Sequence, residues 1–519
     1  MDLPRITRLR RLMVLVICCM SMFIVGIDGT IVNIALPTIA RGLHAEVSGE
    51  QWIVDGYTMV LASLLLFAGS TADRFGRRRT FQTGLIIFTA ASALCSVAPD
   101  LDWLITFRVI QALGASMLNP VAMSIIASVY TTRIDRARAI GVWVSVFGVS
   151  VALGPVVGGI LTSAIGWRSI FWVNVPIGLV TAFLAYMLVP ESRARLPRRP
   201  DPVAQILVTT GLGLLVYAII EGAPSGWHTE RIRVMFCVAA VAFVALFVLE
   251  LRRRDPLIDP RFFRSPGLTS AVLIGVCSFA CLGGFLFLET IYLQDVRGFS
   301  VLHAGLSVLP AAVAIAVFPA AAAWLASRAG PRLPVMLGGL ALALSMAALS
   351  RVSGTSGVGY LIAAYAVFGV GFAMVDAQIS VGAISAMPAA QSGLASGIAS
   401  TSRQMGQALG VAVAGALLNA NLHGSMRVGF VTGSRTAWWV LTGCGGVVLA
   451  IGLAATTQAR GPRSSAGLPP GVDQPTQPIP RIPAAVRPSQ PSQWFPPSPR
   501  PDRGEQQQPP WILAIRAPV

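Results

Sequence analysis

Residues 69–79 read Gly-Ser-Thr-Ala-Asp-Arg-Phe-Gly-Arg-Arg-Arg and interrupt a long apolar part of the chain. The flanking segments, residues 52–70 and 80–98, are each close to the ~20 apolar residues with which a helix crosses a membrane. Gly76 permits a tight reversal between them, and the four arginines oppose partitioning into hydrocarbon. The stretch therefore predicts two neighbouring transmembrane helices joined by a short cytoplasmic loop.

The composition extends this prediction to the whole chain. Of 519 residues, 54% are hydrophobic and 12% are charged, which is typical of a polytopic membrane protein. Every basic residue is arginine, and the missing lysine excludes a Walker A loop and Schiff-base chemistry. The net charge of +17 comes from arginines scattered between apolar runs, which fit short cytoplasmic loops better than a nucleic-acid surface.

No catalytic or metal-binding cluster stands out. The seven cysteines lack metal-ligand spacing, and no nucleophile, base and oxyanion donors occur together. We therefore expect neither an enzyme nor a metal site.

Apolar windows of about 20 residues recur along the chain and predict fourteen transmembrane helices. They cover residues 13–38, 52–70, 80–98, 103–127, 138–162, 168–189, 203–221, 232–250, 269–292, 303–326, 333–350, 357–380, 395–418 and 436–456. Arginine-rich loops alternate with loops that hold few arginines, which places both termini in the cytoplasm.

A short internal repeat suggests how these helices are organised. Residues 74–78 and 328–332 both carry Arg, Gly and Arg at the same spacing, as expected of two parallel copies. The predicted parts are a cytoplasmic N-terminus (1–12), a six-helix bundle (13–189), an inserted helix pair (203–250), a second six-helix bundle (269–456) and a Pro-rich tail (461–519). The tail is too poor in apolar residues to fold alone, so we expect it to be disordered and cytoplasmic.

Further motifs lie inside the predicted helices. The fourth holds Arg108-Val-Ile-Gln-Ala-Leu-Gly114, and the fifth holds Gly154-Pro-Val-Val-Gly-Gly159. The first holds Asp28-Gly-Thr-Ile-Val-Asn33, and the second holds Trp52-Ile-Val-Asp55. With the loop at 69–79, these motifs resemble those of the major facilitator superfamily and of its fourteen-span drug:proton antiporter-2 family.

The resemblance implies an all-α polytopic protein with the major facilitator fold, built from two six-helix bundles and two inserted central helices. It implies proton-coupled export of drugs or other amphipathic small molecules by alternating access, with the proton gradient as energy source and no cofactor. It also implies a bacterial cytoplasmic membrane, in an actinobacterium, with lipids around the helices.

The resemblance also assigns two groups of residues. The conformational latch comprises Gly69, Asp73, Arg74, Gly76 and Arg77. The antiporter motif comprises Gly141, Gly154, Pro155, Gly158 and Gly159.

Three charged residues are candidates for proton coupling. Asp28 and Asp55 lie in apolar helices, where a charged carboxylate is expensive, so each is suited to take up and release a proton. Arg108 is also embedded in a helix and must find an acceptor, either as part of the coupling or in a structural ion pair.

Candidates for substrate contact are Asn33, Gln111, Glu289 and Asp376, although Asp376 has an alternative role as the ion-pair partner of Arg403. The motifs do not define the substrate. An exporter of an endogenous metabolite or lipid is therefore an alternative, and a non-transporting scaffold that acts through its Pro-rich tail is another.

Overall fold

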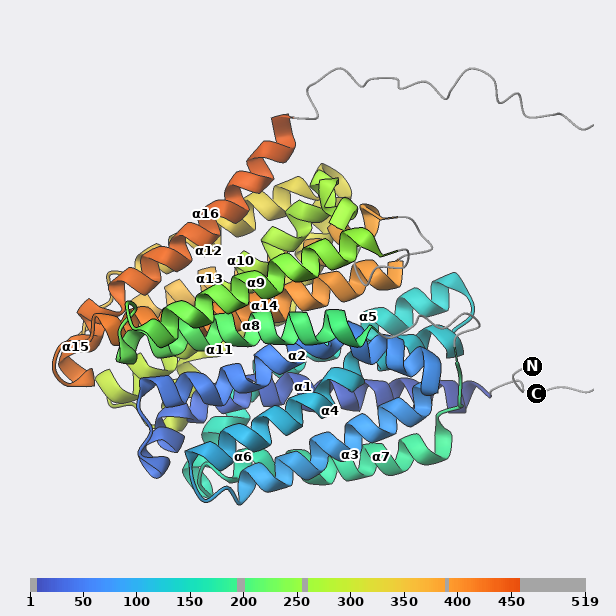
Figure 1. Cartoon of the computed structure of the whole chain (residues 1–519), viewed down its shortest axis with the longest axis horizontal. Helices are drawn as coiled ribbons and strands as arrows, with labels where there is room; N and C mark the ends of the chain where they lie inside the picture. The colour runs from blue at the N-terminus through green and yellow to red at the C-terminus, as the bar shows by residue number, and fades with distance from the viewer. Residues whose placement is uncertain (1–6, 194–200, 254–259, 388–391, 458–519) are drawn as a thin grey trace, which may run out of the picture. The chain divides into compact units, whose positions relative to one another are not determined.

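Long helices follow one another along the chain, in the order that the apolar windows predict (Figure 1). The computed structural model describes residues 7–193, 201–253, 260–387 and 392–457, and these ranges contain no β-strand. The predicted tail (461–519) and the first half of the predicted N-terminus lie outside the described residues.

The first eight elements are α1 (Arg8–Leu43), α2 (Val47–Phe75), α3 (Arg77–Ser96), α4 (Leu101–Val129), α5 (Arg133–Ala164), α6 (Ser169–Trp172), α7 (Asn174–Leu188) and α8 (Pro202–Ser225). They are followed by α9 (Glu230–Arg252), the 3-10 helix η1 (Pro260–Arg264), α10 (Pro266–Ile291), the π-helix η2 (Tyr292–Val296), α11 (Val301–Ala329), α12 (Arg332–Leu349), α13 (Val358–Ser385), α14 (Ser392–Ala420), α15 (Met426–Gly433) and α16 (Arg435–Thr457).

Each predicted span coincides with a helix, but not every helix is long and apolar enough to cross a membrane by itself. Among the described residues eleven helical segments are, with α6 and α7, α10 and η2, and α15 and α16 each counted as one segment; α2 makes twelve if the parts on either side of its 53° bend count as one span. The helices α3 and α14 fall short because polar side chains such as Gln82 and Arg403 lower their hydropathy. The chain is thus a multi-pass membrane protein, and the count of fourteen crossings stays a prediction.

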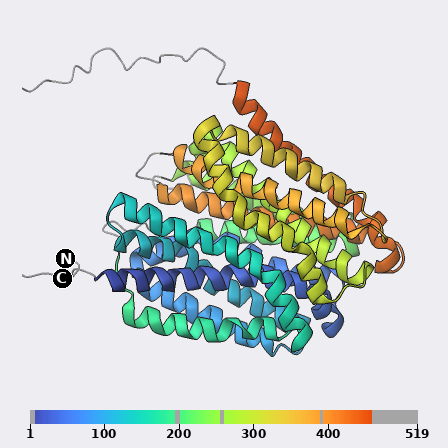
Figure 2. The same cartoon turned by 180° about the vertical axis from the view of Figure 1, so that it is seen from behind.

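The later helices repeat the packing of the earlier ones. In the first set, α1 packs on α5, α2 on α4, and α3 on α4 and α7. In the second set, α10 packs on α14, α11 on α13, and α12 on α13 and α16. The two sets occupy separate groups in Figures 1 and 2. Two parallel copies of one helical unit would produce this recurrence.

The two sets meet along a seam where α5 packs on α11, α2 on α14, and α1 on α10. The predicted inserted pair corresponds to α8 and α9, and α8 packs on both α2 and α14. Ala62, Val216 and Ala412 form part of an apolar cluster shared by these three helices. Helix α8 therefore covers one side of the seam.

Two glutamines join the sets near the predicted outer ends of the helices. Gln51 Nε2 donates hydrogen bonds to the carbonyl oxygens of Ala412 at 2.8 Å and Val411 at 3.3 Å. From the other set, Gln294 Nε2 donates to the carbonyl oxygen of Ile34 at 2.7 Å. These bonds fix the two sets together at this end.

Small residues let α5 approach its neighbours closely. A Cβ atom added at Gly154 would lie 1.9 Å from Thr30 Oγ1 of α1, and one at Gly158 would lie 2.6 Å from Ile34 Cγ2. Gly159 faces α11, where its added Cβ would lie 2.8 Å from Leu302 Cα. Most of the predicted antiporter motif therefore packs α5 against both α1 and the other set.

Gly141 differs from the other glycines of this motif. It is exposed, and no atom lies within 4 Å of a Cβ added there. Gly141 therefore does not take part in the close packing that Gly154, Gly158 and Gly159 allow.

We predict that Gly154→Ala destabilises the protein by about 1–3 kcal/mol, because the new methyl group overlaps Thr30. Gly141→Ala is the matched control and should leave stability unchanged or raise it by up to about 1 kcal/mol, because alanine favours a helix. Thermal unfolding of both variants in detergent checks this. Equal melting temperatures would show that the α1–α5 contact is not tightly packed.

Candidate functional site

A buried ion pair lies in the middle of the first helix set. Arg108 Nη1 of α4 is 2.6 Å from Asp28 Oδ2 of α1, and both side chains are almost fully buried. Gln111 Nε2 and Asn174 Nδ2 each donate to Asp28 Oδ1 at 2.9 Å. The carboxylate of Asp28 therefore receives three hydrogen bonds, which compensates for its removal from water.

The guanidinium of Arg108 is equally well surrounded. It donates to Gln111 Oε1 at 2.9 Å and to the carbonyl oxygen of Ile53 at 3.3 Å. It also lies 4.2 Å from the centre of the Tyr57 ring, which is close enough for a cation–π interaction. The pair thus connects α1, α2, α4 and α7.

Asp55 of α2 has different surroundings from Asp28. Its side chain is fully buried, and its hydrogen bond comes from Thr58 Oγ1 at 3.2 Å, one turn along the same helix. Its Oδ2 atom has no hydrogen-bond partner, and Asp55 forms no ion pair with any residue that the structure describes. The structure therefore separates the two predicted coupling acids into one that is compensated and one that is not.

A small cavity lies on the seam between the two sets. Its lining comprises Thr30, Asn33 and Ile34 of α1, Pro155 of α5, Leu286, Glu289 and Thr290 of α10, and Val308 of α11. It has room for about one water molecule. Two of the four predicted substrate contacts, Asn33 and Glu289, thus line the same cavity.

The other two predicted contacts lie elsewhere. Gln111 belongs to the hydrogen-bond network of Asp28 and Arg108. Asp376 Oδ1 of α13 accepts a hydrogen bond from Arg403 Nε of α14 at 2.8 Å. In this structure Asp376 thus forms the ion pair with Arg403 that the sequence left as an alternative. The side chains of both residues are partly exposed.

The polar contacts of the predicted latch residues lie within the first helix set. Gly76 adopts φ +112°, which a residue with a side chain rarely takes, and it ends α2. Asp73 forms an ion pair with Arg77 at 3.1 Å, and Arg77 N donates to the carbonyl oxygen of Ser192 at 2.9 Å. Arg74 lies 5.6 Å from the centre of the Phe75 ring, and no atom lies within 4 Å of a Cβ added at Gly69.

Several functional neighbours are not evident from the sequence. Glu191, beyond the end of α7, accepts a hydrogen bond from Arg78 N at 3.2 Å and lies 3.9 Å from Arg79 Nε. Asn174 is a neutral residue in an apolar helix, so the sequence gives little sign that it contacts Asp28. The available signal is that an amide inside an apolar helix needs a polar partner, which a charged residue buried in another helix can supply.

Comparisons with known proteins identify the family of the chain. The family model described as Major Facilitator Superfamily matches residues 18–411. The chain is 35% identical over 386 residues to the multidrug resistance protein Stp of Mycobacterium tuberculosis, covering 74% of this chain and 72% of Stp. It is 33% identical over 377 residues to the tetracenomycin C resistance and export protein of Streptomyces glaucescens, covering 72% of this chain and 70% of that relative.

Solved structures show the same fold. A peptide transporter POT in complex with sulfate has a TM-score of 0.63 at 17% identity, covering 87% of this chain and 94% of that chain. An inward-facing, unoccupied bacterial homologue of the human lysosomal transporter Spinster has a TM-score of 0.62 at 17% identity, covering 87% of this chain and 98% of that chain. With the family match and the long relatives, these findings show that the chain belongs to the Major Facilitator Superfamily and is a transporter, not an enzyme.

Proposed function

We propose that the protein exports drugs or other amphipathic small molecules across the cytoplasmic membrane in exchange for protons, by alternating access. Relatives that match about three quarters of the chain are named for multidrug resistance or for resistance to and export of an antibiotic. The observation that carries proton coupling is Asp55, a fully buried carboxyl without a cation partner among the described residues.

The position of Asp55 on α2 supports this role. Gln51, Asp55 and Ala62 are spaced by four and seven residues and therefore share one face of the helix. Gln51 hydrogen-bonds to α14, and Ala62 clusters with Ala412 of α14. Asp55 thus belongs to the face of α2 that follows the seam, where the two sets would separate during transport.

A proton changes the energy of that seam. An ionised carboxyl without a partner costs several kcal/mol in an apolar interior, and protonation removes most of this cost. A closed seam therefore favours protonated Asp55, and an open, hydrated seam favours its release. Binding of a proton at Asp55 and separation of the helix sets are coupled by this difference.

Asp28 and Arg108 have a complementary role in the proposal. Asp28 and Arg108 form an ion pair that ties α1 to α4 in the present arrangement. The pair therefore tunes the state of the first set, while Asp55 carries the proton. The latch residues Asp73 and Arg77 hold the loop in its present local arrangement until the sets move.

Orientation and topology complete the proposal. The arginine-rich loops favour a cytoplasmic position of both termini, and in that orientation the glutamine contacts of the seam lie at the outer side. Closure at that side corresponds to an inward-facing transporter with fourteen crossings, in which α8 and α9 form the inserted pair. Asn33 and Glu289 then line a cavity next to this outer contact, since Ile34 belongs to both.

The first test is a drug-susceptibility panel that compares a deletion strain with a strain overexpressing the protein. We expect overexpression to raise the inhibitory concentration of several amphipathic compounds, and a protonophore to abolish the corresponding efflux. Efflux that continues after the proton gradient has been dissipated would contradict proton coupling. Accumulation of an endogenous compound in the deletion strain, without any change in resistance, would instead favour a metabolite or lipid exporter.

We predict that Asp55→Asn lowers export driven by a pH gradient at least tenfold, because asparagine cannot bind and release a proton. The measurement is uptake of the exported compound into inverted membrane vesicles on which a pH gradient is imposed. Asp102→Asn, at an exposed position in the first turn of α4, is the matched control and should transport normally. Full gradient-driven export by Asp55→Asn would remove Asp55 from the coupling mechanism.

We predict that Asp28→Asn and Arg108→Met each destabilise the protein by about 3–5 kcal/mol, because each leaves a buried group without its partner. The double variant should be less destabilised than the sum of the two. The same cycle on Asp376 and Arg403, which are partly exposed, should give an interaction of about 1 kcal/mol or less. Unfolding in mixed detergent micelles measures both cycles, and equal interaction energies would contradict the special role of the buried pair.

A further inference from the structure

Glu289 lines two cavities whose other lining residues differ. Its side chain is 1% exposed. One cavity is the seam cavity shared with Thr30 and Asn33. The other lies within the second helix set, and like the first it has room for about one water molecule.

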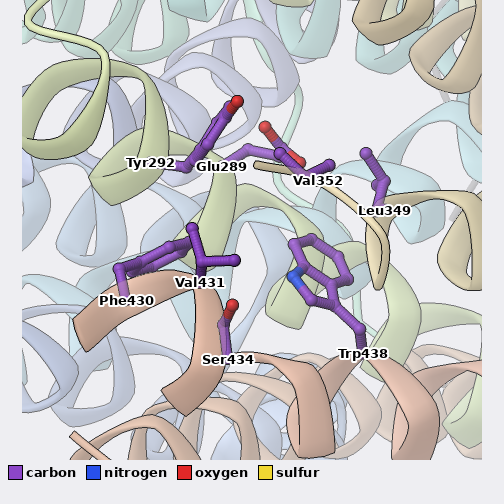
Figure 3. A pocket seen from close by; sticks show the side chains of 8 residues that line it. All are labelled: Glu289, Tyr292, Leu349, Val352, Phe430, Val431, Ser434 and Trp438. Carbon is purple, nitrogen blue, oxygen red and sulfur yellow. The ribbon is translucent and has the colours of Figure 1, made fainter. Parts of the chain in front are cut away.

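The second cavity is lined by aromatic, aliphatic and polar side chains (Figure 3). Glu289 and Tyr292 of α10 and η2 form one side, and residues of α15 and α16 lie opposite them. The complete lining is Glu289, Tyr292, Leu349, Val352, Phe430, Val431, Ser434 and Trp438. Polar groups in this cavity are thus confined to a few positions, with a carboxyl among them.

This second cavity reaches toward the outer loops. Tyr292 Oη donates to the carbonyl oxygen of Ser353 at 2.7 Å, and Ser353 is exposed in the connection between α12 and α13. Arg297 Nη1 lies 3.3 Å from the same Tyr292 oxygen. The predicted topology places this connection outside the cell, so the cavity lies between the outer medium and Glu289.

The charged and titratable groups around Glu289 are few. Tyr365 of α13 donates a hydrogen bond to Glu289 Oε2, Tyr292 lies beside it on η2, and Arg297 lies beyond Tyr292. The neutral residues Thr30 and Asn33 of α1, Ser434 between α15 and α16, and Trp438 of α16 line the two cavities with it. Glu289 forms no ion pair with any residue of the described ranges.

We propose that Glu289 is a second proton-binding residue that receives protons from the outer side and delivers them to the seam cavity. A hydrated proton from the outer medium transfers to the carboxylate, forming an O–H bond and leaving a neutral water molecule. On release, that O–H bond breaks and a water molecule of the seam cavity takes the proton. Nothing is oxidised or reduced.

A water-sized space on each side of one carboxyl suits this transfer better than it suits a drug-sized ligand. The absence of a nearby cation among the described residues leaves Glu289 free to change its protonation without breaking an ion pair. Tyr365 holds the carboxyl in place in both states, since its hydroxyl can donate to either form. The inference rests on the proposed proton coupling of the whole protein.

The test compares Glu289→Gln with the wild-type protein in proteoliposomes. The probe is ethidium or, if ethidium is not carried, the most strongly exported compound of the susceptibility panel. We expect Glu289→Gln to lower transport driven by a pH gradient at least tenfold, while exchange of the probe without a gradient stays within twofold of wild type. Glu230→Gln, at an exposed position in the first turn of α9, is the matched control.

A second variant leaves the carboxyl in place. Ser434→Val fills part of the outer cavity and should slow gradient-driven transport several-fold without changing exchange. It keeps the inference testable if Glu289→Gln fails to fold.

The outcomes separate the two proposals. If transport by the wild type does not depend on the pH gradient, proton coupling itself is overturned. Gradient-driven transport by the wild type and by Glu289→Gln at equal rates would overturn the role of Glu289 alone. Loss of exchange as well as of gradient-driven transport in Glu289→Gln would assign the residue to the probe and not to the proton, and would also overturn it.

Discussion

The contact between Asp28 and Arg108 is the constraint around which the first helix set is arranged. Two opposite charges lie 2.6 Å apart where no water is available to stabilise either of them. Gln111, Asn174 and the ring of Tyr57 are therefore needed at their positions, and they come from three different helices. The second set has no equivalent pair at its centre among the described residues, and Glu289 with Tyr365 occupies the contact between α10 and α13 instead. The first set therefore has a buried ion pair, whereas the second has a buried acid with a neutral donor and a partly exposed ion pair between Asp376 and Arg403.

The seam between the sets follows from their repetition. By their packing, α1, α2 and α5 of the first set correspond to α10, α11 and α14 of the second. The contact of α5 with α11 is therefore equivalent to that of α14 with α2, and α1 contacts its own counterpart, α10. The proposed alternating access would use this repetition, because closure at either end would then involve the same types of contact. Asp55 and Glu289 lie on opposite sets of this seam. Protons bound at the two positions would therefore act on both partners of the same interface.

The sequence predicts the order of the helices well because hydropathy depends on nearest neighbours along the chain. It also identifies Asp28, Asp55 and Arg108, since a charge within an apolar window is conspicuous. It does not predict that Asp28 is paired and Asp55 is not, because that difference depends on which helix faces reach one another across the bundle. The short helix α15, the π-helix at 292–296 and the contact of Glu191 with the loop at 76–79 are missed for the same reason. The sequence also does not show that Gly141 differs from the other glycines of its motif in meeting no neighbouring atom.

The glutamines of the seam bind main-chain carbonyl oxygens and not side chains. Every residue type carries a main-chain carbonyl oxygen, so substitution of Ile34, Val411 or Ala412 leaves the acceptors in place. Each helix set can therefore accumulate substitutions on its own without a matching change in the other. A transporter built in this way can acquire new substrate-facing residues while the interface that closes it stays intact.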